Sequence, residues 1–358
     1  MHRVQSRARS IRLAAVAASL ALSTTVFPAL AAVAPVAVAV APYPNNAAGT
    51  LPAFVTNGEL VGFDVTIGNG NSTTTGVTFT GAVSESPSVA ADATYIGTFV
   101  MGGSAAGQVS CTQSGSFSCN VGNLSGGASL ALRVVYRAPT LTSTEVGTRL
   151  TFTITGQGNG STPNDKGNNS QGDTFTASAS VDVVQLFAND AARRGVAALI
   201  TDTSAFTRTT DPSGFGPSNP TLTEVRIPAF ASQSEIPFGT SLWFTEFTAP
   251  GSECPAASCF GQTVDLHYFD GQPAPRPFRV TLTQDNVKSV VATPSKWTIY
   301  HVLDDGVTVE KPFDVTCSFV NGLPTNAPCG EKRDKTKADK NDYYAIFWLT
   351  ENGRIWGG

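Results

Sequence analysis

The stretch GELVGFDVTIGNG, residues 58–70, decides the fold. Its apolar residues Val61, Phe63, Val65 and Ile67 alternate with smaller or polar residues, and a period of two places all four on one face of a β-strand. The closing Gly-Asn-Gly tolerates positive φ, so we expect the chain to turn there. The stretch therefore predicts a half-buried strand followed by a turn.

The same alternation returns along the chain, separated by turn-rich segments. Charged residues make up only 14% of the chain, whereas it contains 34 Gly and 22 Pro, a composition that favours short strands and turns over helical bundles. We therefore expect an all-β fold of two antiparallel β-sandwiches. The alternations that predict further strands are Leu130–Tyr136, Leu150–Ile154, Phe175–Val183, Leu242–Phe244, Val264–Tyr268, Phe278–Leu282, Trp297–Ile299 and Tyr344–Trp348, and the Pro-broken run Val33–Pro44 predicts an edge strand.

One segment does not alternate. Asn189–Ile200 spaces Ala192, Val196 and Leu199 as on one face of a helix, behind an asparagine that can cap it. A chain of 358 residues is long for a single core, so we expect two domains joined near this segment. The predicted organisation is a signal peptide at 1–31, a sandwich at 32–187, a linker and loop at 188–220 and a second sandwich at 221–358.

The N-terminal region has the features of a secretory signal peptide. Several arginines precede an apolar run from Leu13 to about Phe27, and small residues around Ala31 follow it. We expect cleavage after Ala31. The alternative is an uncleaved anchor, but this interrupted run is short for a membrane span of about 20 apolar residues. The expected product is secreted or associated with the cell envelope and has no membrane span after cleavage.

The charge balance argues against a nucleic-acid partner. The chain carries a net charge of −4, and cleavage after Ala31 removes four arginines and no acidic residue. The resulting protein is more negative still, and it repels phosphate backbones.

Six cysteines fall into three local pairs. In an exported chain disulfides are the default, and although fifteen pairings are possible, the close spacings favour the sequential one. A zinc site is not expected, since the chain has no Cys-x-x-Cys motif and only three histidines. The predicted pairs are Cys111–Cys119, Cys254–Cys259 and Cys317–Cys329.

Residues 58–70, Cys111 and the run 119–127 (CNVGNLSGG) together resemble the bacterial immunoglobulin-like repeat family known as domain of unknown function 11. The loop that contains Pro163-Asn164-Asp165 is also similar, and the resemblance covers about residues 33–185. It implies an immunoglobulin-like sandwich at or beyond the cell envelope, without assigned catalytic residues. The second half is only weakly similar to C-terminal regions of secreted proteins that carry such domains.

Catalytic motifs are weak. His267 and His301 lie inside strand-like runs without a Gly-x-Ser-x-Gly motif, so we expect structural roles for both. A glycoside hydrolase needs two carboxylates across a cleft, and Glu246, Asp265 and Asp270, on or near strands of the second half, are candidates for such a pair. We expect no enzyme, and glycoside hydrolysis is the alternative.

Two weak binding candidates are left. Asn164, Asp165 and Asp173 belong to a cluster of oxygen ligands that suits calcium, although the same residues favour turns. All four tryptophans lie in the second half, where we expect most of them in the core and Trp356 as the exposed one.

The expected function follows from these patterns. It is a non-catalytic structural, adhesive or partner-binding role, with an unknown protein or glycan at the cell surface as partner and no cofactor. The alternative is a carbohydrate-binding or carbohydrate-active protein that uses the second domain.

Overall fold

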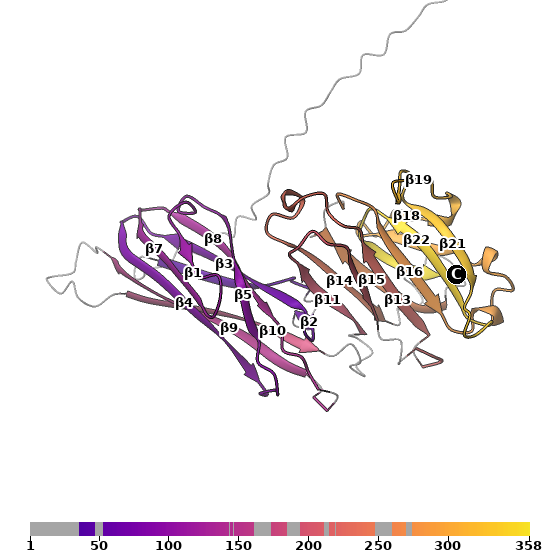
Figure 1. The fold of residues 1–358 in the computed structure, drawn as a ribbon, viewed down its shortest axis with the longest axis horizontal. Helices are drawn as coiled ribbons and strands as arrows, with labels where there is room; N and C mark the ends of the chain where they lie inside the picture. The colour runs from indigo at the N-terminus through magenta and orange to yellow at the C-terminus, as the bar shows by residue number, and fades with distance from the viewer. Residues whose placement is uncertain are drawn as a thin grey trace, which may run out of the picture. The chain divides into compact units, whose positions relative to one another are not determined.

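The structure is a computed structural model, and it shows an all-β protein (Figure 1). Among the residues it describes, strands dominate, the helical segments are short 3₁₀ turns, and no helix has the length and apolar character of a membrane span. The predicted signal peptide lies outside the described residues. These are 36–46, 53–142, 144–145, 147–160, 173–184, 194–210, 215–218, 220–247, 260–269 and 274–358.

Residues 36–184 form two sheets, here called the first sandwich. A four-stranded sheet has the order β1 (Val36–Tyr43), β3 (Leu60–Asn69), β8 (Ser129–Arg137), β5 (Thr94–Gly102). A six-stranded sheet has the order β2 (Phe54–Thr56), β10 (Asp173–Val184), β9 (Gly147–Gly160), β4 (Thr74–Ser86), β7 (Phe117–Leu124), β6 (Ser110–Cys111). Neighbouring strands are antiparallel, except that β2 runs parallel to β10.

The predicted strand at residues 60–67 is the centre of this core. The inward side chains of β3 are at most 1% exposed, as the alternation predicts. Phe63 on β3 stacks on Phe152 of β9, with ring centroids 5.1 Å apart, so the apolar faces of the two sheets meet here. The predicted edge strand is also confirmed, because β1 pairs with β3 alone at the rim of its sheet.

Residues 194–358 form two further sheets, the second sandwich. The six-stranded sheet has the order β11 (Arg194–Ile200), β14 (Thr240–Phe247), β15 (Phe260–Tyr268), β23 (Gly353–Gly357), β17 (Ile299–Leu303), β18 (Val309–Glu310). The five-stranded sheet has the order β12 (Phe206–Thr209), β13 (Thr221–Ile227), β16 (Phe278–Gln284), β22 (Tyr343–Leu349), β21 (Cys329–Lys335). A small hairpin, β19 (Phe319–Val320) and β20 (Leu323–Pro324), stands apart from both.

The helix expected within residues 189–200 is wrong. Its described part is strand β11, which pairs antiparallel with β14, and residues 195–200 are all buried. A strand covered on both faces shows no apolar-polar alternation, so its apolar residues also fit a helical spacing. Strand β12 lies in the predicted linker as well.

The buried face of β22 differs from the expected one. The pattern Tyr344–Ile346–Trp348 suggested one inward face, but Tyr343, Ala345, Phe347 and Leu349 are the side chains with no exposure. Both faces of this strand are apolar, so periodicity alone does not identify the inner one. Trp348 therefore lies on the opposite side of the sheet from the core.

Candidate functional site

The outer face of the five-stranded sheet carries a hollow of about 610 Å³. Three residues on neighbouring strands form the base of the hollow, here called its floor. Arg226 of β13 lies opposite Arg279 of β16, which in turn lies opposite Trp348 of β22. Their chain neighbours Val225 and Val280 are fully buried in the core, so alternation turns the two arginines outward. Three strands distant in sequence thus place two cations and one indole in a single row.

The β19–β20 hairpin forms one wall of the hollow. Asn321 and Gly322 connect its strands, and both have positive φ, as a tight two-residue hairpin turn requires. Phe319 on this hairpin meets Trp348 edge to face, with ring centroids 6.0 Å apart. The Cys317–Cys329 disulfide ties the base of the hairpin loop to β21. The wall is therefore covalently anchored beside the floor.

The arginines of the floor are incompletely paired. Arg279 lies 3.5 Å from Glu331 and 3.8 Å from Glu224, both longer than a charge-assisted hydrogen bond. Glu331 also accepts a hydrogen bond from the indole N–H of Trp348 at 2.9 Å. Arg226 is exposed and makes no ion pair or hydrogen bond with any residue that the structure describes. At the rim, Arg276 is paired with Glu235 at 3.3 Å.

The two histidines are held by carboxylates. His267 is stacked on Trp243, with ring centroids 4.0 Å apart, and its Nε2 lies 3.0 Å from Asp265. His301 is fully buried, and its Nδ1 lies 2.8 Å from Glu310. Each contact fixes a ring within the six-stranded sheet, which supports the structural roles expected from the sequence.

Of the three carboxylates proposed for glycoside hydrolysis, the structure describes Glu246 and Asp265, and Glu246 is not accessible. Glu246 has no exposed surface, and its Oε1 accepts hydrogen bonds from the hydroxyls of Thr210 at 2.8 Å and Thr223 at 2.7 Å. Asp265 faces His267 instead, and Asp270 lies outside the described residues. Glu246 is therefore enclosed in the second sandwich and does not face a substrate.

A carboxyl pair that the sequence did not suggest lies at the end of β16. Burial, followed by the charge of the Asp342 carboxyl and a hydrogen bond with it, raises the pKa of Asp285 above its ordinary value. Asp342 is itself nearly buried and accepts a hydrogen bond from the amide N–H of Asn286 at 2.9 Å. The two groups are joined directly, which leaves no room for a substrate between them.

Asp285→Asn is expected to raise the melting temperature at neutral pH. Because the pKa of Asp285 is raised in the folded state, the folded protein holds this proton more tightly than the unfolded chain does. The contribution of Asp285 to stability is therefore complete below the ordinary pKa and is lost as the pH rises through the raised pKa. Asparagine removes that dependence and can still donate a hydrogen bond to Asp342. Thermal melts at pH 7 and pH 3 check this, with a gain expected only at pH 7. An equal gain at both values would contradict it.

The remaining sequence candidates have mixed outcomes. Trp356 was expected to be exposed, and this is wrong, because it is only 4% exposed; its strand β23 runs inside the six-stranded sheet. Asn164, Asp165 and the side chain of Asp173 lie outside the described part of the chain, so calcium binding there stays a prediction. Within that described part, no three His, Cys, Asp or Glu side chains gather as a metal site.

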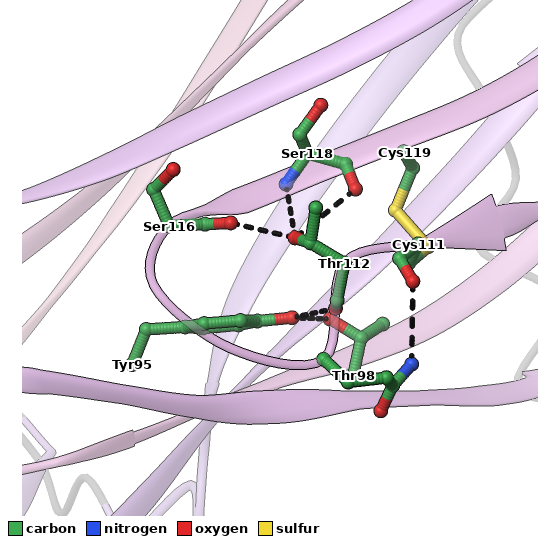
Figure 2. Close-up of a disulfide and its surroundings, with 8 residues drawn as sticks. Tyr95, Thr98, Cys111, Thr112, Ser116, Ser118 and Cys119 are labelled. Atoms are coloured by element: carbon green, nitrogen blue, oxygen red, sulfur yellow. Dashed lines mark hydrogen bonds between the residues drawn. A yellow bond between two sulfur atoms is a disulfide. The ribbon is translucent and has the colours of Figure 1, made fainter.

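Two of the three predicted disulfides are confirmed. Cys111–Cys119 joins β6 to β7, and Figure 2 shows the hydrogen bonds that surround it. The hydroxyl of Tyr95 donates to the carbonyl oxygen of Thr112 at 2.7 Å, and the hydroxyl of Thr112 donates to the carbonyl oxygen of Ser116 at 2.6 Å. Cys317–Cys329 is the second, while Cys254 and Cys259 lie outside the described residues.

No protein-family model matches the chain, and no curated protein matches it either. Among solved structures, the C-terminal domain of the AgI/II polypeptide BspA of Streptococcus agalactiae is 8% identical, with 90% of this chain and 88% of that chain covered and a TM-score of 0.29. The major pilin subunit BcpA of Bacillus cereus is 8% identical, with 60% and 61% covered and a TM-score of 0.27. A family 123 glycoside hydrolase from Clostridium perfringens is 10% identical, with 43% and 28% covered and a TM-score of 0.24.

Proposed function

We propose that the protein is exported and has a non-catalytic, adhesive or partner-binding role outside the cell, with the outer face of the second sandwich as its contact surface. The observation that carries the proposal is the tip of the β19–β20 hairpin, where Phe319 is 45% exposed and Val320 59% exposed. Neighbouring apolar side chains at the edge of a hollow are typical of contact sites, since a partner that covers them removes apolar surface from water.

The disulfides support the proposal that the protein is exported to an oxidising compartment. Cys111–Cys119 and Cys317–Cys329 each close a short local loop, and such bonds persist in oxidising surroundings. We further propose that residues 33–185 form an immunoglobulin-like module of the family that they resemble, and that residues 1–31 are the signal for export. The burial of Glu246, whose carboxylate accepts hydrogen bonds from two threonine hydroxyls inside the second sandwich, favours binding over hydrolysis.

A binding assay with a matched variant tests the role. The labelled full chain is added to intact bacterial envelopes and to immobilised mucin, and bound protein is measured against concentration. The double variant Phe319→Ser/Val320→Ser is expected to lose about tenfold in affinity, the equivalent of one strong contact residue. Val307→Ser is the control, because Val307 is 82% exposed in the turn between β17 and β18 and does not line the hollow. Absence of binding by the unchanged protein, or an equal loss in the control, would overturn the proposal.

A further inference from the structure

We propose that the hollow on the outer face of the five-stranded sheet binds carboxylate-bearing sugars, with Arg226 and Arg279 holding the carboxylate and Phe319 covering the sugar ring. This inference rests on the proposed function, since it names the ligand class of the same surface. Three features of the hollow carry it: a pair of opposed arginines, their available hydrogen-bond donors, and an aromatic wall in a hollow of fitting size.

The first feature is the placement of two like charges directly across a ladder. Arg226 and Arg279 are register partners on β13 and β16, and cross-strand partners on one face have Cβ atoms about 4.5–5.5 Å apart. Like charges on directly opposed partners of a sheet repel each other, and the longer pairs of Arg279 with Glu331 and Glu224 offset this only in part. A carboxylate placed between the guanidinium groups removes the repulsion.

The second feature is the supply of hydrogen-bond donors. A guanidinium group has five N–H donors in a planar fork that matches the two oxygens of a carboxylate. Among described residues, neither Arg226 nor Arg279 makes a hydrogen bond through its side chain, whereas Arg276 at the rim already donates to the carbonyl oxygen of Ala229. The donors of the floor are thus available for an anionic ligand.

The third feature is the aromatic wall. The half-exposed ring of Phe319 stands beside the arginines, and Trp348 supports it from the floor. The volume of about 610 Å³ lies within the range of small-ligand sites and admits a short oligosaccharide. A sugar acid fits both the arginines and the aromatic wall, because its carboxylate faces the arginines while the C–H face of its ring packs on the phenyl group of Phe319. An acidic peptide would engage the arginines and leave the ring uncovered.

Calorimetric titration of the full chain tests the ligand class. The probes are tri-galacturonate, its methyl ester, which has the same rings without the charge, and hexaglutamate, which has the charge without the rings. Arg226→Gln and Phe319→Ser are each expected to weaken tri-galacturonate binding by about tenfold or more, the usual effect of losing one strong contact. Controls are Arg149→Gln, an exposed arginine on β9 of the first sandwich, and Val307→Ser, an exposed residue of the second sandwich that does not line the hollow.

Tight binding of tri-galacturonate, with weaker binding of both other probes and selective loss in Arg226→Gln and Phe319→Ser, would support the inference. Equal affinity for the methyl ester, stronger binding of hexaglutamate, or unchanged affinity in folded Arg226→Gln would overturn it. If no probe binds while the Phe319→Ser/Val320→Ser variant still reduces binding to cell surfaces, the ligand class is wrong and the proposed function stands. If the unchanged protein binds neither probes nor surfaces, both fail.

Discussion

Phe152→Ala is expected to lower the free energy of unfolding by about 3–5 kcal/mol, the usual cost of removing a buried aromatic ring. Phe152 has no exposed surface and is the common neighbour of three other aromatic residues in the first sandwich. Its ring centroid lies 5.1 Å from that of Phe63, 5.7 Å from that of Phe117 and 5.8 Å from that of Tyr136. These rings come from both sheets, so alanine leaves a cavity that neither sheet can close alone.

Urea unfolding followed by far-ultraviolet circular dichroism measures this loss. All four tryptophans lie in the second half of the chain, so tryptophan fluorescence is not the primary readout. Gln157→Ala on the same strand is the control, because an exposed side chain away from special contacts usually changes stability by less than about 0.5 kcal/mol. A loss as small as that of the control would show that the two sheets do not share this core.

Trp297→Ala is expected to have a comparable effect in the second sandwich, again about 3–5 kcal/mol. Trp297 is fully buried and meets Tyr343 edge to face, with ring centroids 6.4 Å apart. Its carbonyl oxygen also accepts a hydrogen bond from the guanidinium group of Arg333 on β21. The indole thereby fills the space between the segment that enters β17 and the strands of the other sheet.

Thermal unfolding followed by the fluorescence of the three other tryptophans measures the effect. Lys296→Ala, at the exposed neighbouring position, is the control and is expected to melt within a few degrees of the unchanged protein. Should Trp297→Ala not fold, Trp297→Phe keeps an aromatic ring and is expected to lose less stability than the alanine variant. A melting temperature of Trp297→Ala equal to that of Lys296→Ala would contradict the packing described above.

The sequence is most informative where one face of a strand meets water and the other meets the core. Val61 to Ile67 alternate cleanly because the other face of β3 carries small and polar residues, of which Thr66 is exposed, and the structure confirms the inward face. β11 is covered on both sides, so its apolar run carries no period of two and also fits the spacing of a helix. β22 carries apolar residues on both faces, one toward the core and one beneath the β19–β20 hairpin.

The candidate site itself could not be predicted from the sequence. Arg226, Arg279 and Trp348 lie far apart in the chain, and strand register alone places them in one row. Register depends on long-range pairing that no local pattern shows. The disulfides were predictable because both cysteines of each described pair are close in sequence, whereas Trp356 was misjudged because its strand lies inside a sheet rather than at its edge.

The position of β23 affects how the protein is made. This strand, residues 353–357, is inserted between β15 and β17, and the amide of Gly358 also donates to the carbonyl oxygen of Thr298. During synthesis, β15 and β17 are finished well before the strand that joins them, so their facing edges have no partner until residue 357 emerges. Unpaired edges invite pairing with other chains. Premature termination before residue 353 should therefore produce an aggregation-prone polypeptide, not a shortened but functional one.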